Sequence, residues 1–290
     1  MGVALLIERD QAGHIVLRST WPLMAGQAYD LHLDGASGPL TIPISVPADK
    51  TVGQVGVSQV APSGDHWPAN TLRFHISFAT PMARGQVEDF VSLIDAAGRT
   101  VPRAFLNLGV ELWSADQKRL TVMFDPGRLK RGVGPNAKLG APLVEGETYA
   151  IRVSASMADA TNRPLSSTTE HWFVAGPAEH RSLNATDWLL SRTSNEIRVR
   201  FDRSMDTQSV VSMLRLREVG GDLVAKQSVF VGNSLIWHWP GMDPDKDFEL
   251  VVGPGLEDVS GNTICAPFDA PLRTGQTCRT GLVLPIPHPR

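Results

Sequence analysis

Apolar and polar residues alternate along short stretches of this chain. The segment 72–78, LRFHISF, has an apolar residue at every second position, and the segment 197–201, IRVRF, does the same. A period of two with one apolar face is the pattern of a half-buried β-strand. The chain also has 26 glycines and 21 prolines spread along its 290 residues, which suits short strands joined by turns. We therefore expect an all-β protein.

The two segments belong to a pattern that occurs twice. In each copy a methionine, Met82 or Met205, follows four residues after the last phenylalanine of the strand. We expect this methionine to fill the end of the core, because its flexible side chain adapts to irregular space. Short helical turns are expected next, at 84–91 and 206–214, with Asp206 suited to cap the second.

Further along, each copy has another alternating strand that runs into a turn. The strands are 149–153 and 248–252, and the turns are 159–162 and 258–262. Aspartate and asparagine in such turns hydrogen-bond their own backbone and accept left-handed geometry. An internal repeat of this size indicates two similar units. The expected organisation is a partial β unit at 1–61, complete units at 62–177 and 178–275, and an extended proline-rich tail at 276–290.

The N-terminal unit carries half of the pattern. Residues 14–46 include the alternating Tyr29, Leu31 and Leu33 but lack the strands that precede them in the other units. Either an incomplete unit opens the chain, or residues upstream are missing. The start shows no basic leader and no small-residue cleavage site. No stretch reaches the roughly 18 apolar residues that a membrane helix needs, so we expect no membrane span.

These motifs together resemble the bacterial Ig-like domain found in surface-layer proteins, of the SbsA type. The residues that match in the first copy are Phe78, Ala79, Pro81, Met82, Asp95 to Gly98, Leu143, Gly146, Tyr149 and Asp159 to Asn162. The second copy matches at Phe201, Met205, Asp258, Gly261 and Asn262, and it departs from the pattern at Ser204 and Phe248. The passage 111–132 is also similar to a subgroup of uncharacterised exported bacterial proteins. The resemblance implies tandem Ig-like β-sandwich domains that serve as spacer, adhesive or surface-display modules. A fold of this kind implies no chemistry by itself.

The chain shows no complete catalytic signature. It has no G-x-S-x-G, H-E-x-x-H or Walker motif. The passage 132–137 matches a dinucleotide fingerprint in letters only, because Pro135 places it in a loop. Adjacent His-Trp residues at 66–67, 171–172 and 238–239 point to opposite faces of a strand, so neither member of a pair helps the other to bind one ligand. We expect no enzyme activity, no cofactor and no metal site.

One candidate binding site is the basic passage at residues 118–131. The candidate ligand-binding residues are Arg119, Arg128, Lys130 and Arg131. In a chain of net charge −3, this local excess of cations suits an anionic polysaccharide, a cell-wall polymer or an acidic protein surface. The whole-chain charge gives no reason to expect nucleic acid. The other interpretation is a solvated loop in which Arg128 or Arg131 pairs with Asp125 or Glu111.

The two cysteines, Cys265 and Cys278, leave two readings open. In an exported protein they would form a disulfide that ties the tail to the last strand. In a cytosolic protein they would be free thiols.

The sequence therefore predicts a non-catalytic structural, adhesive or binding module of an exported or cell-envelope bacterial protein. Its expected partners are a cell-wall polymer, a glycan or another envelope protein. A first alternative is a carbohydrate- or cell-wall-binding protein that uses the basic passage. A second is a hydrolase with its site at the junction of the two units, where a hydrogen-bonded histidine and carboxylate would meet.

Overall fold

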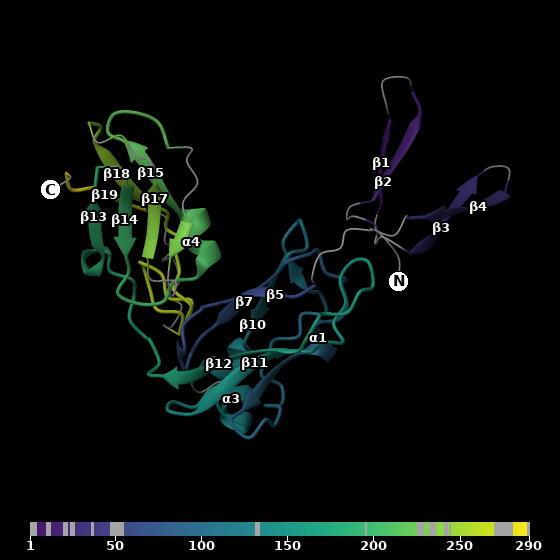
Figure 1. Ribbon diagram of the computed structural model, residues 1–290, viewed down its shortest axis with the longest axis horizontal. Helices are drawn as coiled ribbons and strands as arrows, with labels where there is room; N and C mark the ends of the chain where they lie inside the picture. The colour runs from purple at the N-terminus through teal and green to yellow at the C-terminus, as the bar shows by residue number, and fades with distance from the viewer. Residues whose placement is uncertain are drawn as a thin grey trace.

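A computed structural model gives the arrangement of the chain (Figure 1). The structure describes residues 5–9, 13–19, 23, 27–35, 38–46, 55–130, 134–194, 196–224, 229–231, 236–240, 243, 245–269 and 281–288. Strands dominate these residues, and the helices are short. The prediction of an all-β chain is confirmed.

The first complete unit is a β-sandwich of two four-stranded sheets, which we call sandwich 1. One sheet runs in the order β5 (Val57–Ala61), β7 (Arg73–Phe78), β10 (Arg119–Met123) and β9 (Leu112–Trp113). The other runs in the order β6 (His66–Pro68), β12 (Thr169–Gly176), β11 (Thr148–Val153) and β8 (Val91–Asp95). The pairs are antiparallel except for β6 with β12, which is parallel. In chain order this is the A-B-E-D and G-F-C arrangement of the immunoglobulin fold, with β6 added beside strand G.

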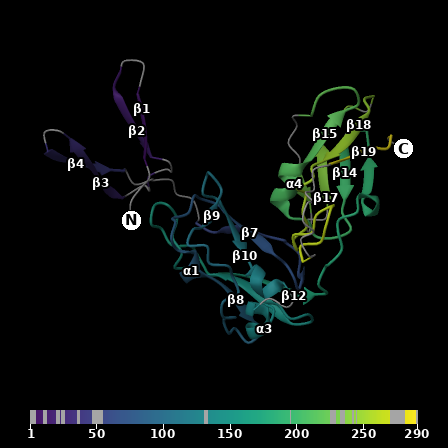
Figure 2. The same ribbon diagram turned by 180° about the vertical axis from the view of Figure 1, so that it is seen from behind.

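The second unit, sandwich 2, has the same topology. One sheet runs in the order β13 (Leu189–Arg192), β14 (Glu196–Arg200), β17 (Ile236–Pro240) and β16 (Val229–Val231). The other runs in the order β15 (Leu214–Glu218), β18 (Phe248–Val252) and β19 (Leu282–Pro285). Figures 1 and 2 show that the two sandwiches stand at an angle and meet at one end.

The bounds of both units differ from those expected. Strand β5 pairs with β7, so sandwich 1 begins before residue 62. Strand β19 pairs with β18, and Ile286 is buried against the same core, so the expected tail at 276–290 contributes the last strand of sandwich 2. The prolines misled this prediction, because an edge strand tolerates proline where a central strand does not.

In the two sandwiches, alternation places one face of the central strands in a core. In sandwich 1, Phe74 and Ile76 are fully buried, and Trp67 stacks on Phe173 with ring centroids 4.1 Å apart. Met82 and Met205 are also fully buried, and each bridges to the aspartate that opens the later turn of its unit. The same contact between a methionine and an aspartate therefore occurs in both sandwiches.

The helices are short segments between strands. After each buried methionine come α1 (Val87–Phe90) and α4 (Thr207–Met213), close to the expected ranges. The side chain of Asp206 accepts a hydrogen bond from Ser209 N at 2.6 Å, which caps α4 as predicted. The others are α2 (Pro126–Leu129), α3 (Gly134–Leu139) and the 3-10 turn η1 (Ala185–Asp187).

The N-terminal unit consists of two separate antiparallel hairpins. They are β1 (Leu5–Arg9) with β2 (Ile15–Ser19), and β3 (Ala28–Gly35) with β4 (Gly38–Ser45). Within the described part of the chain, no helix is both long and apolar enough to cross a membrane.

Candidate functional site

Arg128, the centre of the basic passage, is a buried structural residue. Its side chain is 4% exposed, and its guanidinium donates to five backbone carbonyls. The acceptors are the carbonyl oxygens of Pro102, Arg103, Leu139, Gly140 and Ala141. Because every arm of the fork already has a partner, Arg128 holds two loops of sandwich 1 together. Ligand binding by Arg128 would require some of these bonds to break.

The other candidate cations do not form one cluster with Arg128. Lys130 lies over the ring of Phe268, with Nζ 4.7 Å from the centroid, so it contacts a loop of sandwich 2. Arg119 lies at the start of β10 and the loop begins at its far end, which separates them by roughly 15 Å of strand. Arg131 lies outside the described residues. A ligand role for these four residues stays a prediction.

A cavity of about 770 Å³ opens at one edge of sandwich 1, between β8 and the segment 100–111. The carboxylate of Glu111, which lines this cavity, already has hydrogen-bond donors within the protein. It accepts from the backbone N–H groups of residues 85–87 and from Trp113 Nε1. Glu88, another lining residue, accepts from Asn107. These side chains close the edge of the sandwich, and no histidine is among the described residues that line the cavity.

The junction between the sandwiches, which we call the joint, contains a buried histidine–carboxylate pair. Nε2 of His75, on β7, lies 2.8 Å from Oδ2 of Asp206, at the start of α4. The other ring nitrogen, Nδ1, lies 2.9 Å from Oγ1 of Thr121. The side chains of His75 and Asp206 are 5% and 3% exposed. This is the arrangement expected of a hydrolase site, but both side chains are buried, and neither lines the cavity between β8 and the segment 100–111.

Two further charges complete this buried cluster. Nε of Arg73 lies 3.1 Å from Oδ2 of Asp206, and its guanidinium also pairs with Glu257. Burial alone would raise the pKa of Asp206, but the hydrogen bond and charge of His75 and the charge of Arg73 outweigh it and hold that pKa below its ordinary value. The joint therefore contains a charged carboxylate with two partners from sandwich 1.

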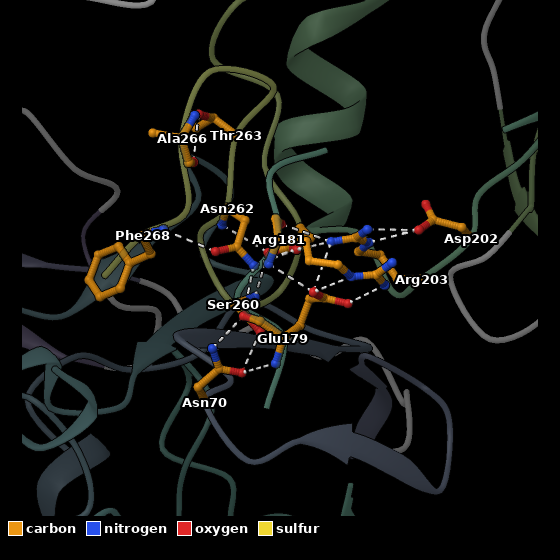
Figure 3. Close-up of polar contacts among 11 residues, drawn as sticks. Asn70, Glu179, Arg181, Asp202, Arg203, Ser260, Asn262, Thr263, Ala266 and Phe268 are labelled. Carbon is orange, nitrogen blue, oxygen red and sulfur yellow. Dashed lines mark hydrogen bonds and ion pairs between the residues drawn. The ribbon is translucent and has the colours of Figure 1, made fainter. Parts of the chain in front are cut away.

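The linker between the sandwiches is held from both sides (Figure 3). Asn70 of sandwich 1 accepts from the backbone N–H of Glu179 at 2.8 Å and donates to its carbonyl at 2.6 Å. Asn262 of sandwich 2 donates to the same carbonyl at 3.0 Å, and Ser260 donates to the side-chain oxygen of Asn70 at 3.0 Å. One linker peptide thus receives hydrogen bonds from both domains.

The turn 258–262 lies directly against sandwich 1. The backbone N–H of Leu72 donates to the carbonyl of Val259 at 2.7 Å. Gly261 has φ +80°, and a Cβ atom there would lie 2.6 Å from Cδ2 of Leu72. Only glycine suits this position, because it provides both the left-handed backbone and the space.

The equivalent turn of sandwich 1 is built differently. The same backbone bonds place Asn162 at the position of Gly261 and Arg163 at the position of Asn262. Asn162 has φ +63° and is exposed. The left-handed position is therefore filled by asparagine in one copy and by glycine in the other.

Cys265 is disulfide-bonded. Cys278 lies outside the described residues, so its pairing with Cys265 stays a prediction. Among the described residues, no group of three or more His, Cys, Asp or Glu side chains is placed to hold a metal ion.

The tryptophans of the His-Trp pairs are mostly in the cores. Trp67 and Trp239 are 0% and 2% exposed, so their rings pack in the cores of the two sandwiches and not on the surface. Trp172 is 40% exposed and donates to its neighbour Glu170 on the same strand.

Comparison with known proteins gives no family. No protein-family model matches the chain, and no curated protein matches it. Among solved structures, the S-layer protein rSbsC is similar at 10% identity and TM-score 0.31, over 81% of this chain and 26% of that one. Alpha-2-macroglobulin from Escherichia coli is similar at 9% identity and TM-score 0.29, over 81% of this chain and 72% of that one. Chicken CNTN1 FN1–FN3 domains are similar at 15% identity and TM-score 0.21, over 96% and 83%.

These TM-scores are too low to establish a shared fold or role. The chain spans about a quarter of the S-layer structure. The Ig-like fold is instead established by the strand order of the two sandwiches.

Proposed function

We propose that the chain is a non-catalytic structural module of an exported or cell-envelope bacterial protein, in which two Ig-like sandwiches are held in a fixed orientation. The observation that carries the proposal is the joint. Domains in one chain usually move relative to each other unless their interface is extensive. Here directional hydrogen bonds and a buried His75–Asp206 pair define one geometry. Such a geometry suits a rigid spacer, which holds its two ends at a set distance and angle, and not a flexible one.

Two observations support location outside the cytosol. Cys265 is disulfide-bonded, and disulfides persist in oxidising compartments. The repeated motifs resemble the Ig-like domains of the SbsA type, whose known setting is the bacterial surface layer. The His75–Asp206 pair supports a structural role over a hydrolytic one, because it is buried at the joint and does not line the cavity at the edge of sandwich 1.

The orientation can be measured with paired spin labels on the full chain. The exposed positions Ala96 and Val219, one on each sandwich, suit substitution by a labelled cysteine. We expect a narrow distance distribution in the otherwise unchanged chain, and a broad one after Asp206→Ala. An exposed carboxylate outside the joint, Asp187 in the 3-10 turn η1, provides the control, and Asp187→Ala should leave the distribution narrow. A broad distribution in the unchanged chain would overturn the proposal.

For a partner, we propose a cell-wall polymer, a glycan or another envelope protein. The support is the partly exposed Arg119 and the exposed Trp172, since Arg128 and Lys130 have intramolecular partners. Sedimentation with cell-wall material at low and physiological salt tests this idea. Salt-sensitive binding that is lost in Arg119→Ala supports a polymer partner, whereas binding lost only in Trp172→Ala points to a sugar ring. No sedimentation of the unchanged chain contradicts both.

A further inference from the structure

The carboxyl group of Asp258 lies at the joint without a cation of its own. Asp258 is 1% exposed and accepts hydrogen bonds from the backbone N–H groups of Ser260 and Asn262, both at 2.9 Å, and from Asn262 Nδ2 at 2.8 Å. The nearest cation is Arg203, with Nη1 3.7 Å away. This distance is longer than that of a direct hydrogen-bonded pair.

Arg203 is shared among several acceptors (Figure 3). Its Nη2 lies 2.8 Å from Asp202, and its Nη1 lies 3.4 Å from Glu179 and donates to the carbonyl of Arg181. Arg181 itself pairs with Glu179 at 2.8 Å. Arg181 and Arg203 thus lie near three carboxylates. Their direct ion pairs are with Glu179 and Asp202, and not with Asp258.

Sandwich 1 supplies no free compensating charge to this turn. Its charged groups at the joint are Arg73, His75 and Lys130, and Lys130 lies over the ring of Phe268. In the linker, His180 pairs with Asp269 at 2.8 Å. Arg73 pairs with Glu257 and Asp206, and His75 pairs with Asp206. What sandwich 1 places next to the turn of Asp258 is apolar or neutral: Leu72 and Asn70.

The equivalent aspartate in sandwich 1 shows the contrast. Nη2 of Arg163 lies 2.8 Å from Asp159, in the turn that has no sandwich packed against it in this way. Burial would raise the pKa of Asp159, but hydrogen bonds from Arg163 and Thr161 outweigh burial and lower it. For Asp258, burial dominates over the hydrogen bonds of Asn262 and raises the pKa to about 6.

We propose that the joint is a pH-responsive contact, which closes more tightly as the pH falls from neutral to mildly acidic. Opening the joint exposes the turn of Asp258 to water, which favours the ionised carboxylate. The closed joint keeps the carboxyl dry and favours its protonated form. Because a proton binds the closed state more tightly, adding protons shifts the equilibrium towards closure. This depends only on the joint and holds for any role of the chain.

The response has a lower limit, set by the other buried carboxylate. Asp206 is charged in the closed joint, where His75 and Arg73 hold its pKa below the ordinary value of 3.8. Protonation of Asp206 in stronger acid therefore weakens the contact with His75. We expect closure to be greatest in mild acid and to decline on both sides.

Distance measurements between Ala96 and Val219 labels from pH 4.5 to 8 test the proposal. They are made on the full chain and on the full chain with Asn70→Ala, which removes the hydrogen bonds between Asn70 and Glu179. Loss of these bonds destabilises the closed joint, so that the open state is populated enough to be measured. The closed-to-open ratio should rise as the pH falls from 8 to 5, by about 10-fold if the pKa of Asp258 returns from about 6 to its ordinary value of 3.8 on opening. In the same backgrounds, Asp258→Asn should stay closed at every pH, because asparagine keeps the turn and carries no charge.

The matched control is Asp159→Asn, which makes the same change in the equivalent turn away from the joint and should keep the pH response. A response that is absent from both backgrounds, or that survives Asp258→Asn, overturns the proposal. The result also separates this proposal from the fixed orientation. A distribution that is narrow at every pH in both backgrounds contradicts only the pH response, whereas one that is broad at every pH contradicts the fixed orientation.

Discussion

Nε2 of His75 lies 2.8 Å from Oδ2 of Asp206, and this contact joins residues 131 positions apart in two different sandwiches. His75 comes from the middle of a strand, and Asp206 is the cap of a helix that follows another strand. One carboxylate therefore has a local task, capping α4, and a long-range task, fixing the neighbouring domain. This double use makes Asp206 the residue through which local folding of sandwich 2 is coupled to domain orientation.

We expect Asp206→Ala to lower the free energy of unfolding by about 3–5 kcal/mol, because it leaves His75 buried without its carboxylate and removes one of the two carboxylates that pair with Arg73. Asp206→Asn keeps the cap and a hydrogen-bonding group, so its loss should be smaller. Denaturant unfolding monitored by tryptophan fluorescence measures both. Equal stability of all three proteins would contradict the assignment of Asp206 to the joint.

Gly98 and Gly261 have nearly the same backbone conformation, but only Gly261 lies against another residue. Alanine substitutions at the two positions therefore distinguish the cost of backbone strain from the cost of a steric contact. Gly98 has φ +77° with nothing within 4 Å of an added Cβ, whereas Gly261 has φ +80° with Leu72 2.6 Å away. Gly98→Ala should lower the free energy of unfolding by about 1 kcal/mol through backbone strain alone. Gly261→Ala should cost more, and small-angle scattering should show a larger radius of gyration only for this variant. Identical scattering of the two variants would mean that Leu72 moves aside without cost.

Arg128 provides a test of whether the basic passage is architectural. Arg128→Leu leaves five carbonyl groups without their donor, so we expect the free energy of unfolding to fall by about 3 kcal/mol. Lys130→Ala removes one cation–π contact with Phe268 and should lower it by less than about 1 kcal/mol. Thermal unfolding of the two variants beside the unchanged chain measures the difference. Full stability of Arg128→Leu would return Arg128 to the set of candidate ligand residues.

The alternation of 72–78 was enough to predict a strand, its buried face and the all-β class, because a two-residue period is a local property. The cap at Asp206 was equally local. The role of His75 was not visible, because the polar face of the strand reads as solvated until the second sandwich covers it. The contacts of Arg128 were not predictable for a related reason: its five acceptors are backbone carbonyls, and the sequence does not show which carbonyls lie near a side chain. The strand β19 was missed because its prolines resemble a disordered tail.

The stability of sandwich 2 should depend on pH through Asp258. Its pKa is raised by burial to about 6 in the folded chain, against an ordinary value of 3.8. Between these two pH values the folded chain binds more protons than the unfolded chain, so the free energy of unfolding falls as the pH rises from about 4 to 6. The full difference corresponds to about 3 kcal/mol at most.

Asp258→Asn should remove this component of the pH dependence and leave the chain more stable than the unchanged one at pH 7. Asp159→Asn should do the opposite at pH 7, because the pKa of Asp159 is lowered and its charged form stabilises the fold. Denaturant midpoints at pH 5 and pH 7 measure all three proteins. If Asp258→Asn is destabilised at pH 7 to the same extent as Asp159→Asn, the Asp258 carboxylate is stabilising in the joint and the raised pKa is wrong.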